Sequence, residues 1–168
     1  MGMTPDDLIA REQIRDVVYR YARGVDRRDF ALVRGCYHPD ATDDHGAYSG
    51  GIDGFIPWLE SQLARWSVTS HTMANILIEL HDDRARVETY AVAYHRTIAQ
   101  ADKPLRDITA GVRYVDDMTK VAGMWAISRR VVVSDWVRVD DVPAGSVRDD
   151  DPYTQPRPFP HDEVYRPL

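Results

Sequence analysis

The second half of the sequence contains four long segments rich in valine, isoleucine, threonine and tyrosine. They span residues 68–80, 85–99, 106–118 and 124–139. β-Branched and aromatic residues favour strands, and the short polar connections between these segments are typical of neighbouring antiparallel strands. The segments therefore predict an antiparallel meander, with turns at 81–84 and 122–123 and a loop around Asp102. This pattern limits the possible folds more than any other feature of the chain.

Helical patterns come before the strands. Thr4-Pro5-Asp6-Asp7 is typical of a helix start, with Thr4 as the N-cap and Pro5 at the first helical position. An apolar stripe at helical spacing follows, made of Ala10, Ile14, Val17, Val18, Tyr21, Ala22 and Val25. We predict one helix from Pro5 to about Gly24, a short second one from Asp29, and a third over residues 54–66. Helices followed by strands indicate the α+β class.

Two stretches lack a clear helix or strand pattern. Residues 41–51 are rich in turn-forming residues and predict a loop or small hairpin, with at most a short strand near Ala47 and Tyr48. Residues 142–168 contain six of the ten prolines, so they predict a disordered tail or an extended arm laid on a neighbouring surface. We therefore expect a domain over residues 1–140 and a proline-rich arm or tail over 141–168.

Length and charge exclude several classes of protein. A chain of 168 residues is typical of one domain with its own core. Its net charge of −6 argues against nucleic acid or an anionic membrane as partner. The single cysteine, Cys36, fits a reducing compartment, and no apolar run approaches the roughly 20 residues needed to span a bilayer. We expect a cytoplasmic protein.

The usual catalytic signatures are missing from the sequence. It has no P-loop, no Rossmann glycine fingerprint, no GxSxG elbow, no HExxH and no CxxC. Any chemistry must therefore depend on histidine, aspartate, tyrosine and arginine.

Two residues stand out as candidates for that chemistry. The apolar stripe of the first helix ends at Val25, so Asp26 lies at the rim of whatever the helix covers. His71 begins the first long strand; pleating places Met73 and Asn75 on its side, and Ile76 and Ile78 on the other. A helix-end aspartate can simply cap or solvate the helix, and a histidine on a mixed strand face can be hydrogen-bonded filler.

Three further groups leave alternatives open. Asp43-Asp44-His45 resembles a metal site, but adjacent residues on one loop rarely all reach one ion, so we predict no metal and attribute Asp43 and Asp44 to a turn. His95 could line a pocket or be exposed. Arg129 and Arg130 point to opposite faces of their strand, so only one of them can enter a pocket.

The order of these elements and three local motifs resemble the SnoaL-like branch of the nuclear transport factor 2-like superfamily. The resemblance covers roughly residues 5–138. Its marks are Tyr21 to Asp26 before Asp29-Phe30, the run Tyr37 to Ala41, His71 opening a strand, and Gly123-Met124-Trp125 opening the last strand. It implies a cystatin-like α+β cone, a curved and mainly antiparallel sheet closed by three N-terminal helices into a single pocket. That fold also hosts binding proteins and structural subunits.

Within the superfamily, the pattern looks closest to cofactor-free lyases: scytalone dehydratase, hexachlorocyclohexane dehydrochlorinase and bile-acid 7α-dehydratase. The resemblance implies that Asp26 pairs with His71, and that Arg130 and Tyr21 act as donors beside them. We predict catalytic roles for Asp26, His71, Arg130 and Tyr21. Predicted substrate contacts are Tyr48, Met73, Asn75, His95, Trp125 and Arg129.

An aspartate bonded to one imidazole nitrogen fixes the tautomer and leaves the other nitrogen as a base. In a dry pocket such a base takes a proton from carbon, which leads to elimination or isomerisation without a cofactor. We predict a small apolar cyclic or polyketide-like substrate, and a homodimer or homotrimer formed through the open side of the sheet. The alternatives are a ligand-binding protein without catalysis, or a structural subunit like the small chain of ring-hydroxylating dioxygenases.

Overall fold

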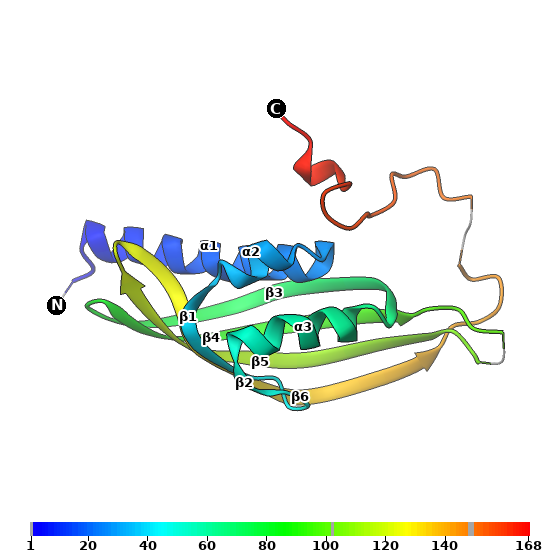
Figure 1. The fold of residues 1–168 in the computed structure, drawn as a ribbon, viewed down its shortest axis with the longest axis horizontal. Coiled ribbons are helices and arrows are strands. Elements are labelled where there is room, and N and C mark those ends of the chain that lie inside the picture. The colour runs from blue at the N-terminus through cyan, green and yellow to red at the C-terminus, as the bar shows by residue number, and fades with distance from the viewer. Residues whose placement is uncertain (1, 102, 148–149) are drawn as a thin grey trace.

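A computed structural model describes residues 2–101, 103–147 and 150–168, and shows three helices against one face of a curved sheet (Figure 1). The helices are α1 (Pro5–Arg27), α2 (Phe30–Arg34) and α3 (Ile52–Leu63). The strands are β1 (Tyr37–Asp44), β2 (Ser49–Gly51), β3 (Trp66–His81), β4 (Arg84–Thr97), β5 (Arg106–Val121) and β6 (Met124–Asp141). The predicted α+β class is confirmed.

The six strands lie in the order β2-β1-β6-β5-β4-β3. Strand β1 runs parallel to β6, and the other neighbours are antiparallel. The predicted curved and mainly antiparallel sheet is therefore confirmed, although the sheet is open and does not close into a barrel. The ends of β5 and β6 project beyond the helices (Figure 1), so part of the concave face has no helix over it.

Helix α1 begins where its capping sequence predicts. The backbone N–H of Thr4 donates to the Asp7 carboxylate at 2.8 Å, and the backbone N–H of Asp7 donates to the Thr4 hydroxyl at 3.2 Å. All seven residues of the predicted apolar stripe are buried. The helix ends at Arg27, three residues later than expected, because Arg28 adopts a left-handed conformation with φ 54° and closes the last turn. Asp26 consequently lies in that last turn.

Glycine at position 24 lets α2 pack directly on α1. A Cβ atom there would lie 2.7 Å from Cγ2 of Val33 and 3.1 Å from its backbone nitrogen. We predict that Gly24→Ala lowers the free energy of unfolding by about 1–3 kcal/mol, because the short helix must be displaced. Urea unfolding measures the difference.

The control is Gly35→Ala, at the C-cap of α2. A Cβ atom at Gly35 would meet only backbone oxygens at 3.4 and 3.5 Å, and the residue is right-handed helical. This variant should be at least as stable as the wild type. If Gly24→Ala is equally stable, α2 can shift at no cost and the close approach is unimportant.

The small hairpin expected as one alternative over residues 41–51 is present, but its strands lie on either side of Ala47 and Tyr48 and the first begins earlier than expected. Helix α2 ends at Arg34, and residues 37–44 and 49–51 form β1 and β2. Strand β1 is stabilised by a distant partner, since Asp43 pairs with Arg130 of β6 and Thr42 with Arg129. A parallel pairing of this kind leaves no local sequence signal. Helix α3 also ends earlier than predicted, because Trp66 belongs to β3.

Strand β3 differs from the prediction in a way that affects the site. It begins at Trp66, so His71 is not its first residue. The pairing with β4 shifts register between Met73 and Ile76. This irregularity returns Ile76 and Ile78 to the face that His71 occupies, and Ile78 is buried in the core. Asp102, at the centre of the predicted β4–β5 loop, lies outside the described residues.

The described part of the segment after β6 folds back onto its own chain. The backbone N–H of Phe159 donates to the carbonyl oxygen of Arg27 at 2.6 Å, and Arg27 pairs with Asp162 at 3.1 Å. Figure 1 shows this red segment beside the C-terminal end of α1. The surface under this part of the arm is therefore the end of the helix that carries Asp26.

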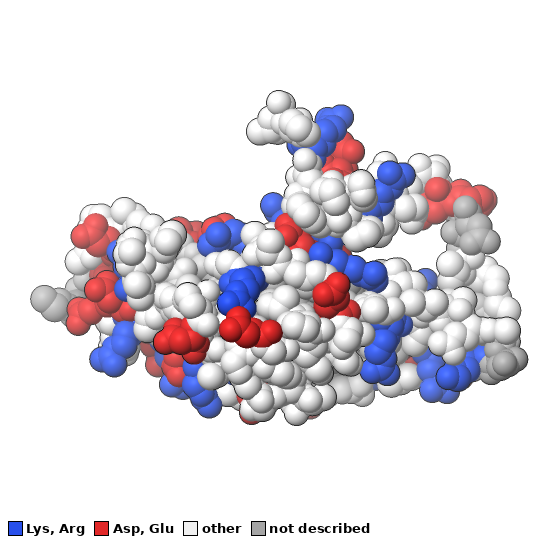
Figure 2. Space-filling model, in the orientation of Figure 1, with Lys and Arg blue, Asp and Glu red and all other residues white. Residues whose placement is uncertain are grey.

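Basic and acidic side chains are mixed on the face shown in Figure 2, without a large patch of one sign. Mixed charge of this kind is typical of a solvated surface. Within the described ranges, no helix combines the length and the apolar character needed to cross a membrane.

Candidate active site

Asp26 and His71 form a two-point contact between the end of α1 and the middle of β3. One carboxylate oxygen of Asp26 lies 2.7 Å from Nδ1 of His71, and the other accepts the backbone N–H of His71 at 2.8 Å. The side chains are 14% and 7% exposed, respectively. Because an ionised carboxylate only accepts hydrogen bonds, Nδ1 carries the proton and Nε2 of the neutral ring is an acceptor. The predicted contact is present, while its catalytic role stays a prediction.

His95 of β4 lies beside His71 and is partly buried, while its predicted contact with a substrate stays a prediction. The two rings are 5.5 Å apart in an edge-to-face arrangement, and His95 stacks on Trp66 at 5.2 Å. Its Nδ1 lies 2.9 Å from the hydroxyl of Thr69. Burial is the main cause that lowers the pKa of His95 to about 4; the neighbouring His71 lowers it further and Asp26 opposes the shift. His95 is therefore neutral at pH 7.

The pKa of His95 predicts a loss of stability in mild acid. Its folded-state pKa of about 4 lies below the ordinary value of 6.5. Between these two values the unfolded chain binds a proton that the folded chain does not, so the free energy of unfolding falls as the pH is lowered through this window. Between pH 7 and 4.5, we expect the free energy of unfolding of the wild type to fall by on the order of 1–2 kcal/mol more than that of His95→Gln. Urea unfolding at both pH values checks this, and parallel losses would contradict it.

Arg130 is the arginine that points inward. Its guanidinium makes two hydrogen bonds to the carboxylate of Asp116, both at 2.7 Å, and a longer one to the hydroxyl of Tyr37 at 3.3 Å. Both members of the ion pair are buried. Arg129 is exposed on the opposite face, 3.9 Å from Asp117. The predicted substrate contact from Arg129 is therefore wrong, because pleating turns it away from the concave face.

The surroundings of Arg130 favour a positioning role. Its guanidinium carbon lies 4.1 Å from the ring centre of Tyr21 and 4.4 Å from that of Tyr114. Burial alone would lower the pKa of Arg130, but the Asp116 carboxylate raises it well above the ordinary value, so the group stays charged. Tyr21 is 1% exposed, and burial raises the pKa of its hydroxyl. Both groups are buried among aromatic rings, and the catalytic roles predicted for them stay predictions.

A second group of polar residues was missed by the sequence analysis. The buried carboxylate of Asp43 accepts the hydroxyl of Tyr37 at 2.7 Å and lies 2.9 Å from Nδ1 of His45. Assigning Asp43 to a turn was wrong because it belongs to β1. One signal was available, since Ala41 and Asp43 are two residues apart and share the buried face of a strand.

Three other residues that were predicted to contact the substrate lie in three different environments. Tyr48 packs on Trp58 of α3 at 5.5 Å and donates its hydroxyl to the carbonyl of Gly51 at 2.5 Å. Met73 is half-buried against the core. Asn75 is exposed at the register shift of β3, so the prediction that it shares the face of His71 is wrong.

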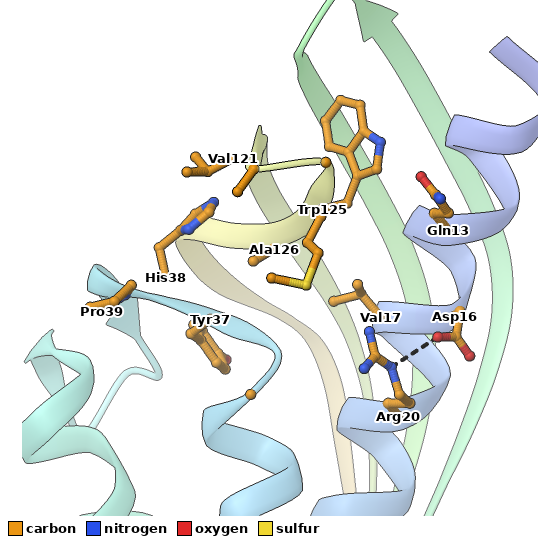
Figure 3. A pocket seen from close by; sticks show the side chains of 14 residues that line it. Gln13, Asp16, Val17, Arg20, Tyr37, His38, Pro39, Val121, Trp125 and Ala126 are labelled. Carbon is orange, nitrogen blue, oxygen red and sulfur yellow. Dashed lines mark ion pairs between the residues drawn. The ribbon is translucent and has the colours of Figure 1, made fainter. Parts of the chain in front are cut away.

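Trp125 lies in a different hollow from Asp26, so the predicted site residues do not all line one pocket. Its hollow has a volume of about 470 Å³ and also contacts Gln13, Arg20 and His38 (Figure 3). Gln13 and Arg20 lie on α1 well before Asp26. A smaller hollow of about 160 Å³ lies beside Asp26 itself, and its lining includes residues 67–69 and the arm residues 156–158.

No group of three or more histidine, cysteine, aspartate or glutamate side chains that could hold a metal ion occurs among the described residues. The polar groups on the concave face are instead paired carboxylates and imidazoles, which are suited to moving protons.

Several solved structures share this fold. A proposed scytalone dehydratase of Novosphingobium aromaticivorans is 22% identical, with a TM-score of 0.71 over 84% of this chain and 97% of that one. A hexachlorocyclohexane dehydrochlorinase of Novosphingobium barchaimii is 19% identical, with a TM-score of 0.71 over 83% of this chain and 94% of that one. At such identities the likeness establishes the fold alone.

Sequence comparison identifies relatives and a family. An uncharacterised protein of Mycobacterium tuberculosis is 28% identical over 125 residues, which are 72% of this chain and 82% of the relative. Residues 6–131 match the SnoaL-like domain, so the match includes α1, the whole helical layer and most of the sheet. The chain therefore belongs to the SnoaL-like family.

Proposed function

We propose that the protein is a cofactor-independent lyase that takes a carbon-bound proton next to a carbonyl and expels a leaving group from the neighbouring carbon. The observation that carries this proposal is the two-point contact between Asp26 and His71. Two proteins of the same fold have names that describe loss of water and of hydrogen chloride. Both names describe an elimination.

The geometry supplies a base in a fixed orientation. Asp26 holds Nδ1 of His71 and also binds its backbone N–H, so the ring cannot turn without breaking a contact. Nε2 takes the proton, and the carboxylate stabilises the imidazolium that forms. The electrons of the C–H bond pass through an enolate into the new double bond as the leaving group departs. Return of the proton to another carbon would give isomerisation instead.

The concave face supports a small apolar ring as the substrate. Apolar side chains that are only partly buried against the core include Trp58, Trp66, Met73, Val112 and Val132. Such walls, with a few convergent polar groups, are typical of sites for small apolar ligands. This site requires no cofactor, since the enolate forms directly from the substrate.

The first test measures proton removal from carbon alone, and a second test measures elimination. Wild-type protein is incubated with 2,2-dideuterio-1-tetralone, and loss of deuterium from the carbon next to the carbonyl is followed by proton NMR. We expect exchange that His71→Gln abolishes and that the exposed control His81→Gln leaves unchanged. Elimination is followed with 3-chloro-1-tetralone by chloride release and with 3-hydroxy-1-tetralone by absorbance of 1-naphthol. Exchange and elimination that are absent, or unaffected by His71→Gln, would contradict the proposal.

We also propose that the protein forms a homodimer or homotrimer through the outer face of its sheet. That face exposes Leu77, Tyr90, Val92 and Trp136. Exposed apolar patches of this kind commonly mark interaction surfaces. Light scattering at micromolar concentration measures the mass, and a monomer would count against the proposal.

A further inference from the structure

The protein contains a second carboxylate–imidazole pair with the arrangement of the first. Asp43 lies 2.9 Å from Nδ1 of His45, just as Asp26 lies 2.7 Å from Nδ1 of His71. Each carboxylate also accepts one further hydrogen bond, from the Tyr37 hydroxyl in one pair and from a backbone N–H in the other. In both pairs, therefore, Nδ1 is fixed and Nε2 is directed away from the carboxylate.

The Asp43–His45 pair packs against Tyr114 of β5, a strand that lies between β1 and β3 in the sheet. The ring centre of His45 is 6.3 Å from that of Tyr114. Burial is the main reason why the pKa of the Tyr114 hydroxyl lies above its ordinary value; Arg130 opposes the shift, and the carboxylates of Asp116, Asp43 and Asp26 add to it. In the strand order, His45 follows β1 and His71 belongs to β3, with β5 between them.

The environment of His45 differs from that of a histidine that only fills a core. Its side chain is 21% exposed, while that of Asp43 is fully buried. The ring packs against Phe55 at 5.3 Å and Trp58 at 5.6 Å, both on α3. Within the described part of the chain, its hydrogen bonding involves Nδ1 alone. Nε2 therefore remains available beside the apolar walls of the concave face.

We propose that His45 is the general acid that protonates the leaving group, and that the substrate is consequently a β-hydroxy carbonyl compound that loses water. This inference rests on the proposed function, in which His71 is the base. Hydroxide is a poor leaving group and needs a proton as its bond to carbon breaks, whereas a halide departs as a stable anion without one. A second proton-transfer group is useful only for the first kind of substrate.

The proposed reaction is balanced. Nε2 of His71 takes the proton from the carbon next to the carbonyl, and the C–H electrons form the double bond. The C–O bond of the neighbouring carbon breaks, and its electrons take the proton from Nε2 of the His45 imidazolium, so that water leaves. His71 ends as the imidazolium and His45 as the neutral ring beside Asp43. Exchange with solvent then restores both rings.

Asp43 and its partners position His45. Arg130 donates to Tyr37, Tyr37 donates to Asp43, and Asp43 accepts from His45. This chain connects the buried ion pair with the proposed acid. Asp43 is a positioning residue, since its carboxylate is fully buried and touches the substrate only through the imidazole.

The experiment measures proton removal and loss of water separately on one ring. Deuterium loss from 2,2-dideuterio-1-tetralone requires the base alone, whereas 3-hydroxy-1-tetralone needs both base and acid to give 1-naphthol. We expect His45→Gln to lower the dehydration rate by about 100-fold or more and to leave the exchange rate within about threefold of wild type. Asp26→Asn should lower both rates. His81→Gln, which changes an exposed histidine, is the control.

Two further measurements test the fold of the variant and the tautomer of His45. Far-UV circular dichroism of His45→Gln should match that of the wild type. ¹⁵N NMR of the wild-type imidazoles should show neutral His45 protonated on Nδ1, and Asp43→Asn should lose this preference. A neutral His45 protonated on Nε2 would overturn the inference without any substrate.

The outcomes separate this inference from the proposed function. Dehydration that survives in His45→Gln, or that falls only in step with exchange, overturns the role of His45 and leaves the base intact. A wild-type protein that releases chloride from 3-chloro-1-tetralone but does not dehydrate 3-hydroxy-1-tetralone overturns the inferred substrate class. Absence of all three reactions overturns the proposed function and this inference together.

Discussion

Replacing Asp26 with asparagine is expected to lower the elimination rate by about 10⁴-fold while the protein stays folded. The carboxylate accepts two hydrogen bonds, from Nδ1 and from the backbone N–H of His71. An amide has only one oxygen to offer. If that oxygen keeps the backbone N–H, the amide NH₂ faces Nδ1, which must then be unprotonated. The proton moves to Nε2, and the base is lost.

The measurement is the rate of deuterium loss from 2,2-dideuterio-1-tetralone, together with the ¹⁵N NMR shifts of the His71 ring. Asp16→Asn is a matched control, because Asp16 lies on the same helix and pairs with Arg20 at the surface. The variant at position 26 should show both the rate loss and the change of tautomer. Full activity in Asp26→Asn would make Asp26 a structural residue, and the base would have to be sought elsewhere.

The Asp26–His71 contact could be predicted because its determinants are local. The apolar stripe of α1 ends at Val25 and so fixes the position of Asp26, and the composition of β3 places His71 in a strand. The family resemblance then connects two residues that are 45 positions apart. Neither inference depends on the exact ends of the elements. The contact was therefore predicted correctly although the predicted start of β3 was too late.

The second pair could not be predicted, because its determinants are distant in the sequence. Asp43 is held in a strand by pairing with Arg130 of β6, which lies far along the chain. Locally, Asp43, Asp44 and His45 have the composition of a turn. The same limit applies to the ion pair of Arg130 with Asp116, whose positions depend on register shifts in β6 and β5. Pleating alone showed that one of two adjacent arginines points inward, but not which one.

The buried ion pair should dominate the stability of the sheet. We expect Asp116→Asn to lower the free energy of unfolding by about 3–5 kcal/mol, because the charge of Arg130 would remain buried without its partner. Arg130 is 1% exposed and Asp116 is fully buried. Urea unfolding followed by circular dichroism measures the loss. Equal urea midpoints of unfolding for the variant and the wild type would show that water reaches the guanidinium of Arg130.

Asp117→Asn is the matched control for this variant. Asp117 is the next residue of β5 and points to the outer face, where it pairs with Arg86 at 2.6 Å and its side chain is 37% exposed. A surface pair of this kind contributes roughly 0–1 kcal/mol, so the control should remain close to wild type. The two variants make the same chemical change on opposite faces of one strand, and any difference between them is due to burial.

A double variant then separates stability from function. Replacing Arg130 with methionine and Asp116 with leucine removes both charges together, and buried ion pairs can often be replaced by apolar side chains without loss of stability. We expect the double variant to regain most of the free energy of unfolding that Asp116→Asn loses. It should still dehydrate 3-hydroxy-1-tetralone more slowly, because Tyr37 loses the donor that holds it toward Asp43. A double variant that is both stable and fully active would show that the ion pair has no part in positioning His45.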